Sequence, residues 1–220
     1  MAQQFPKPPP DETPLGARRT PTVADVILAS ASSGRAALLQ AAGVTHRAMA
    51  AFVDEAAVKT TMTGDGAEPG EIAQALADRK ALAISEVKPR ALVIGADQVL
   101  VCAGAMFDKP GDRERARAQL QALRGRDHQL LSAASLAIGS RIVWRHLDTA
   151  QLTMRRFSDG FLERYLAAID DDVLACAGSY QVEGRGAQLF SRIDGDFYAI
   201  IGLPLLPILE ILRSHGAMPS

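Results

Sequence analysis

The sequence predicts an α/β or α+β fold built on a mixed β-sheet. Apolar runs of strand length alternate along the chain with longer segments of helical pattern. One Asp-Gly turn signal, at Asp194 and Gly195, lies between two short apolar runs and predicts an antiparallel hairpin. With 220 residues, 48% of them hydrophobic, the chain can form one globular domain or one core with two lobes.

Composition excludes several classes of protein. The formal net charge of −1 gives no basic excess to neutralise phosphates, so we expect no general nucleic-acid binding. No apolar run approaches the length of a membrane span, and no secretory signal is visible. Cys102 and Cys176 both have apolar sequence neighbours and no metal-ligand spacing, so we expect two buried thiols in a reducing, cytoplasmic compartment.

The N-terminus differs in composition from the rest of the chain. The first 21 residues hold six of the twelve prolines and lack an apolar segment. We therefore expect a flexible, Pro-rich extension over residues 1–25, one folded domain over residues 26–216 and a short tail over residues 217–220.

The folded part begins with the elements of an anion site. Residues 26–29 are a short apolar strand, a loop containing Ser30, Ser32 and Arg35 follows, and residues 36–42 have a helical pattern. Backbone N–H groups at a helix N-terminus attract negative charge, hydroxyls donate to it, and a guanidinium fits phosphate. The alternative is an ordinary serine N-cap beside an exposed arginine.

The next elements are a strand over residues 47–53, a loop over residues 60–70 and a helix over residues 69–86. The strand ends at Asp54 and Glu55, whose carboxylates would either bind a hard cation or be solvated. Lys80 lies in the helix among alanines, where lysine is usually a surface residue.

A lone carboxylate interrupts the apolar segment of residues 91–102. Because Gly95 and Ala96 precede Asp97, we expect two strands with the acid at a strand end. Asp97 would then face a cleft or be a solvated turn residue. The sequence Asp108-Lys109-Pro110, shortly downstream, favours the functional interpretation.

The second half continues the alternation. We expect a helix over residues 113–124 capped by Asp112, strands over residues 128–138 and 141–156 with Trp144 packed on the sheet, and a helix from Ser158 to about residue 169 with a Phe157–Leu162 staple. A solvated acidic run at residues 170–172, a glycine-rich loop at residues 176–186, a hairpin of residues 189–193 with 197–201 and a helix from Pro204 to about Gly216 complete the chain.

Four sequence blocks, taken together, resemble the Maf family of nucleoside triphosphate pyrophosphatases over about residues 26–216. They are ILASASSGR at residues 27–35, VDE at 53–55, IGADQ at 94–98 with Lys109-Pro110, and GSYQVEG at 178–184 with IGLP at 201–204. The chain departs from the family pattern at Ser33, where relatives have proline, at Gly34, where they have a large or basic residue, and at residues 128–133, which lack a threonine and a glycine.

The resemblance implies an elongated mixed sheet, two lobes around a central cleft and often a homodimer. It implies hydrolysis of a nucleoside triphosphate to the monophosphate and diphosphate, with a divalent metal such as Mg²⁺ or Mn²⁺, or Co²⁺. The residues supply this chemistry: Asp97 would orient or deprotonate water, Glu55 and Asp97 would hold the metal, and the phosphates would contact Ser30, Ser32, Arg35, Lys80 and Lys109. The sequence does not separate the base and metal-ligand roles of Asp97.

The resemblance also indicates which residues select the base. Gln98 and Glu183 resemble the pair of residues found in the subgroup that acts on 7-methyl-GTP. The chemistry is consistent with this, since a carboxylate accepts hydrogen bonds from guanine N–H groups. Gly34 counts against this subgroup, which has a bulky side chain there that could stack on a base; the small residue would leave a broader pocket. The alternatives are a dTTP/UTP pyrophosphatase, a general housecleaning enzyme for modified nucleotides, or a non-enzymatic regulator of septum formation with the Pro-rich extension as a tether.

Overall fold

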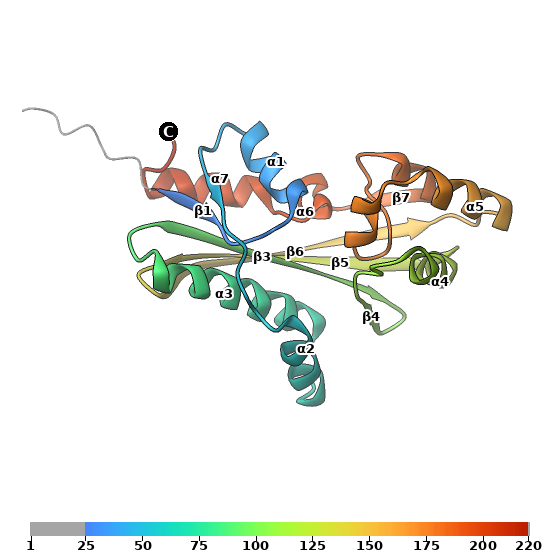
Figure 1. The fold of residues 1–220 in the computed structure, drawn as a ribbon, viewed down its shortest axis with the longest axis horizontal. Coiled ribbons are helices and arrows are strands. Elements are labelled where there is room, and N and C mark those ends of the chain that lie inside the picture. Colours follow the sequence, from blue (N-terminus) through green and yellow to red (C-terminus); the bar gives the residue numbers. More distant parts are fainter. Residues whose placement is uncertain (1–24, 220) are drawn as a thin grey trace, which may run out of the picture.

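A computed structural model describes residues 25–219 of the chain (Figure 1). The expected N-terminal extension lies, except for Asp25, outside the described residues. No helix within the described part is long and apolar enough to cross a membrane.

The core of the fold is one mixed, seven-stranded sheet, as the sequence predicts. Its strands are β1 (Val26–Leu28), β2 (Arg47–Ala48), β3 (Leu92–Cys102), β4 (Ala105–Phe107), β5 (Asp127–Ile138), β6 (Arg141–Met154) and β7 (Phe190–Asp194). They follow the order β2-β1-β3-β5-β6-β7, and β4 pairs with β3 outside this path. β1 is parallel to β2 and β3, whereas the remaining pairs are antiparallel.

Helices cover both faces of the sheet (Figure 1). α3 (Pro69–Val87) lies along one face, and α1 (Ser33–Ala41), α6 (Phe197–Ile201) and α7 (Leu205–Ser214) lie on the other. α4 (Arg113–Leu123) and α5 (Asp159–Ala168) lie at one end of the elongated sheet, and α2 (Glu55–Gly64) projects beyond α3. Two 3-10 helices, η1 (Asp171–Ala175) and η2 (Arg185–Leu189), precede β7.

Because helices cover both faces of the sheet, neither face of β3 is polar. Successive side chains of a strand point to opposite faces, so both sets must be apolar when both faces are covered. Ile94 packs in one cluster with residues of α1 and α7, and Val93 packs in another with residues of α3. At Gly95 α3 approaches the strand so closely that a Cβ would lie 2.1 Å from the carbonyl oxygen of Ala77. This contact fixes the helix that carries Lys80 against the strand that carries Asp97.

One edge of β3 is left unpaired in its middle. β5 pairs along the whole other edge, from Val93 to Val101. On the free side β1 pairs only with residues 92–94, and β4 pairs only with residues 100–102. Residues 95–99 therefore face a gap in the sheet, and two successive residues there, Asp97 and Gln98, line a cavity although their side chains point to opposite faces of the strand.

Four expectations about local structure were wrong. Residues 91–102 form one continuous strand, so Asp97 lies in its middle and not at a strand end. The strand expected over residues 47–53 is only the two-residue β2, and helix α2 occupies part of the expected loop. β7 pairs with β6 and is followed by α6, so no hairpin forms at Asp194 and Gly195. The acidic run at residues 170–172 is exposed, as expected, and Asp172 also lines a cavity.

Candidate functional site

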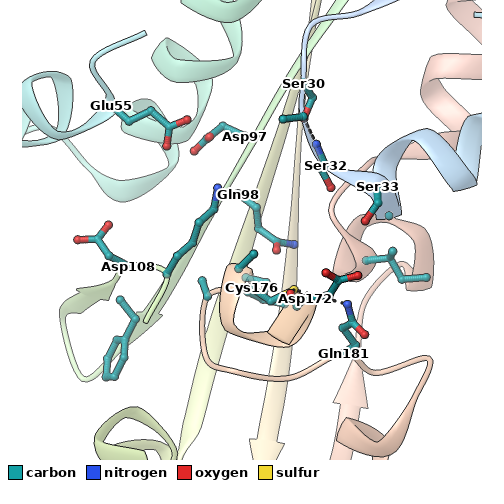
Figure 2. Close-up of a pocket in the computed structure, with 18 of the residues that line it drawn as sticks. Ser30, Ser32, Ser33, Glu55, Asp97, Gln98, Asp108, Asp172, Cys176 and Gln181 are labelled. Carbon is teal, nitrogen blue, oxygen red and sulfur yellow. Dashed lines mark hydrogen bonds between the residues drawn. The ribbon is translucent and has the colours of Figure 1, made fainter. Parts of the chain in front are cut away.

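A cavity of about 740 Å³ opens at the gap beside β3 (Figure 2). Its wall brings together segments that lie far apart in the sequence: the loop before α1, the start of α2, the middle of β3, the segment after β4 and the loop after η1. Nine of the ten site residues expected from the sequence line it, namely Ser30, Ser32, Gly34, Glu55, Lys80, Asp97, Gln98, Lys109 and Glu183. The tenth, Arg35, is not part of the wall.

Lys80 joins the two carboxylates that were expected to hold a metal. Its Nζ lies 2.6 Å from Oδ1 of Asp97 and 2.6 Å from Oε1 of Glu55. The side chains of Lys80 and Asp97 are 9% and 7% exposed. The lysine is therefore buried, because a buried carboxylate requires a partner of opposite charge.

Glu55 reaches this cluster as the first residue of α2, and not from a strand end as expected. Asp54 caps the helix by accepting a hydrogen bond from the backbone N–H of Ala57 at 2.9 Å. Burial alone would raise the pKa of Glu55, but the hydrogen bond and charge of Lys80, together with the charges of Lys109 and Lys59, lower it below its usual value. Glu55 is therefore an anion at neutral pH.

The serine loop presents hydrogen-bond donors to the cavity. Ser32 is the N-cap of α1 and accepts from the backbone N–H of Arg35 at 3.3 Å, as the capping alternative predicts. Ser30 Oγ accepts from the N–H of Ser32 and from Arg35, so its own proton remains to donate. Ser33, which was not among the expected site residues, also lines the cavity. The capping and anion-binding interpretations of this loop are compatible.

Arg35 faces backbone carbonyls. Its Nη1 donates to the carbonyl of Ala96 at 2.8 Å, and its Nε donates to the carbonyl of Gly202 at 2.8 Å. Burial lowers the pKa of the guanidinium, and the negative charges of Asp97 and Glu55 oppose that shift. The side chain thus ties the serine loop, β3 and the end of α6 together, and it satisfies the Ala96 carbonyl at the free edge of β3.

Gln98 has a fixed amide orientation. Its Nε2 donates to the carbonyls of Ala199 and Ile200 in α6, at 3.0 and 3.1 Å, and to Ser132 Oγ at 2.8 Å. Ser132 in turn donates to the carbonyl of Ala199 at 2.7 Å. Carbonyl oxygens only accept, so the NH₂ group must face them. The carbonyl oxygen of Gln98 is consequently the group left to act as an acceptor.

Glu183 and Cys176 come from the loop after η1, which is anchored at several points. The hydroxyl of Tyr180 lies 2.8 Å from Nε2 of His128, and the hydroxyl of Tyr165 donates to the carbonyl of Ser179. The two expected buried thiols differ: Cys102 is buried, whereas Cys176 is partly exposed in the cavity wall. Burial is the main cause that raises the pKa of Cys176.

Sequence reasoning missed several residues of the wall. Lys59 and Thr60 come from α2, which was expected to be a loop from residue 60 onward. Asp172 is exposed, as expected, but its place in the cavity wall was not predicted, and Asp108 was noted only as part of a motif. A helical reading of residues 55–64 would have placed Lys59 one turn after Glu55, on the same side of α2.

The cavity has more acidic than basic groups. Its lining contains three lysines, Lys59, Lys80 and Lys109, and five carboxylates, Glu55, Asp97, Asp108, Asp172 and Glu183, which leaves a net charge of −2. The described residues include no cluster of three or more His, Cys, Asp or Glu side chains that could hold a metal alone. Glu55 and Asp97 nevertheless converge on one cationic nitrogen, and carboxylate oxygens suit Mg²⁺ and Mn²⁺. A bound polyanion would supply the missing oxygen ligands.

Comparisons with known proteins identify the family of the chain. Residues 25–215 match the family model described as Maf-like protein. The chain is 50% identical over 193 residues to a nucleoside triphosphate pyrophosphatase of Granulibacter bethesdensis, which covers 88% of this chain and 98% of the relative. It is 47% identical to proteins named 7-methyl-GTP pyrophosphatase from Brucella abortus, over 86% of this chain and 94% of the relative, and from Mesorhizobium japonicum, over 88% and 97%.

Proposed function

We propose that the substrate of this chain is 7-methyl-GTP. The chain belongs to the Maf family and is a nucleoside triphosphate pyrophosphatase, which is an acid anhydride hydrolase. The products would be 7-methyl-GMP and diphosphate. Relatives of similar identity have both the general name and the 7-methyl-GTP name, so the choice of base must be argued from the cavity.

The fixed amide of Gln98 is the observation that supports a guanine base. Its Nε2 is held by the Ala199 and Ile200 carbonyls, so it offers an acceptor oxygen. Glu183, also in the cavity wall, offers carboxylate oxygens. Guanine has N–H donors at N1 and N2 on one edge, whereas uracil and thymine have a single N–H between two carbonyls. Two acceptors therefore match guanine better.

The 7-methyl group adds a charge that the cavity also suits. Methylation at N7 gives the purine ring a positive charge. Glu183 and Asp172 are both on the cavity wall, and their carboxylates would attract a cationic ring. Gly34, where relatives of the 7-methyl-GTP subgroup have a larger side chain, lies beside Ile201, whose Cγ2 would be 3.8 Å from an added Cβ. Gly34 is thus a departure from that subgroup, and the two carboxylates are what favour a cationic base.

The phosphates would lie between the serine loop and the lysines. Ser30 and Ser32, at the N-terminus of α1, would donate to phosphate oxygens, and Lys109, which has no ion pair within the described residues, would neutralise their charge. Arg35 would act by holding the Ser30 loop in place. Lys80 holds Oδ1 of Asp97, which leaves Oδ2 to accept a proton from the attacking water. Attack breaks the anhydride between the α and β phosphorus atoms.

A divalent cation fits this arrangement. When bound, it would neutralise the phosphate oxygens and lower the pKa of the attacking water. Glu55 and Asp97 would hold it, because the lining has a net charge of −2 and cannot alone balance a triphosphate. The expected homodimer stays a prediction, which light scattering after size exclusion measures directly.

Product analysis tests the reaction and its metal requirement. The chain is incubated with 7-methyl-GTP and Mg²⁺, Mn²⁺ or Co²⁺, and monophosphate, diphosphate and orthophosphate are separated. Equal amounts of monophosphate and diphosphate are expected, with no reaction in a chelator. The variant Asp97→Asn should lose roughly 10²- to 10⁴-fold in kcat. Release of orthophosphate, or full activity of the variant, would contradict the mechanism.

A further inference from the structure

Lys59 and Asp108 form an ion pair across one end of the cavity. Lys59 lies on the second turn of α2, and Asp108 follows β4 directly. The Nζ of Lys59 is 2.6 Å from Oδ1 of Asp108, and both residues line the cavity. Figure 2 shows Asp108 on the same side of the cavity as Glu55, away from Gln181. The lysine side chain is 22% exposed, whereas that of Asp108 is 75% exposed.

The three cavity lysines differ in how firmly their charges are held. Lys80 is fixed by two carboxylates, and it is buried together with one of them, Asp97, whereas Glu55 is partly exposed. Lys59 has a single partner, the exposed Asp108. An ion pair with an exposed carboxylate contributes only about 0–1 kcal/mol, so an incoming phosphate can replace it. Asp108 therefore keeps Lys59 in place, and the ammonium can still bind an incoming phosphate.

The position of Lys59 indicates which part of a nucleotide it would meet. The acceptors for the base, Gln98 and Glu183, belong to β3 and the loop after η1. Lys59 lies on α2, the helix that begins with Glu55, and it pairs with the neighbour of Lys109. It thus lies on the same helix as Glu55 of the carboxylate cluster, whereas the residues for the base lie on other segments of the wall. A phosphate chain with its base at Gln98 and its α–β anhydride at the cluster would extend toward α2 and Lys59.

We propose that Lys59 binds the terminal phosphate of the substrate and sets the preference for a triphosphate over a diphosphate, with Asp108 holding the lysine in place until the nucleotide arrives. This inference rests on the proposed function, since it assigns one end of the same site. A charge-assisted hydrogen bond to a γ-phosphate would form only with the triphosphate. Lys59 would then contribute to binding and not to the chemical step.

Calorimetric titration with two nonhydrolysable analogues tests the proposal. The probes are the α,β-methylene triphosphate and the α,β-methylene diphosphate of the nucleoside that the wild-type chain uses best, both with Mg²⁺. Lys59→Gln should weaken the triphosphate roughly 10- to 100-fold and leave the diphosphate within about twofold. Lys88→Gln, an exposed lysine outside the cavity, is the matched control. Equal weakening of both analogues would overturn the proposal.

Asp108→Asn separates phosphate binding from a structural role of the ion pair. If Lys59 binds phosphate, removing the competing carboxylate should keep or increase the affinity for the triphosphate. If the ion pair serves only to hold α2 against the segment after β4, Asp108→Asn should weaken binding as much as Lys59→Gln does, and this result would overturn the proposal.

The proposed function and this inference can fail separately. A wild-type chain that releases no diphosphate from any nucleotide would refute the proposed function. An active chain in which Lys59→Gln does not change the preference for a triphosphate would refute only this inference.

Discussion

The ammonium of Lys80 lies 2.6 Å from a carboxylate oxygen of Asp97, and both side chains are buried. Glu55 shares the same ammonium at 2.6 Å. The lysine therefore stands between two groups that would otherwise repel each other, and its removal leaves the buried carboxylate of Asp97 without a partner beside the partly exposed Glu55.

Lys80→Met should lower the free energy of unfolding by about 3 kcal/mol, because it leaves buried charge without a partner. Mn²⁺ should raise the melting temperature of this variant more than that of the wild type, since a cation can replace the lost ammonium. Calorimetry with and without Mn²⁺ measures both effects, with Lys88→Met as control. If the variant were as stable as the wild type, the carboxylate of Asp97 would not depend on Lys80 as its partner.

Arg35→Met distinguishes a positioning role from a phosphate contact. The guanidinium satisfies the carbonyls of Ala96 and Gly202, so its loss should cost about 2–4 kcal/mol of stability as both acceptors lose their partner. Urea unfolding measures this change. If stability were unchanged and only the KM for the nucleotide rose, Arg35 would instead contact phosphate, as the sequence suggests.

Glu183→Gln should change base selection without changing the fold. An amide at this exposed position can present a donor as well as an acceptor, so the variant should lose about tenfold or more in kcat/KM for guanine nucleotides relative to UTP. Steady-state kinetics on both nucleotides measures the ratio. Glu210→Gln, an exposed glutamate on α7 outside the cavity, serves as the control. An unchanged ratio would remove Glu183 from base recognition.

His128 should make the protein less stable in mild acid. Burial lowers its pKa to about 4, below the usual 6.5. Between these values the unfolded chain binds the proton more readily, so stability is fully present above pH 6.5 and is lost as pH falls toward 4. From the two pKa values, the free energy of unfolding should fall by about 2 kcal/mol between pH 7 and pH 5. Urea unfolding at both pH values tests this, and His128→Gln should reduce the difference by that amount.

Most of the site could be predicted from local sequence, but the partners of its charges could not. The motif around Asp97 was recognisable, yet its strand is continuous, because Gly95 lets α3 pack closely against the strand and does not end it. The burial of Lys80 depends on Asp97, 17 residues away in the sequence, and on Glu55. Such pairing depends on tertiary packing, so it cannot be predicted from a short stretch of sequence.

Two helices were missed for a different reason. In α2, Thr60, Thr61 and Thr63 have low helix propensity, and the helix is stabilised by the Asp54 cap and by burial of Val58. The segment FYAII of α6 has strand-forming residues, but Asp196 caps it by accepting from the N–H of Ala199 at 2.8 Å. In both cases one capping side chain and tertiary contacts outweighed intrinsic propensity.

Competition between two nucleotides tests the central claim most directly. Wild-type chain is given 7-methyl-GTP and UTP at equal concentration with Mg²⁺, and both monophosphates are measured early in the reaction, so that their ratio equals the ratio of the two kcat/KM values. The fixed acceptor of Gln98 and the carboxylate of Glu183 predict that 7-methyl-GMP predominates by at least tenfold. A ratio at or below one would contradict the proposed substrate.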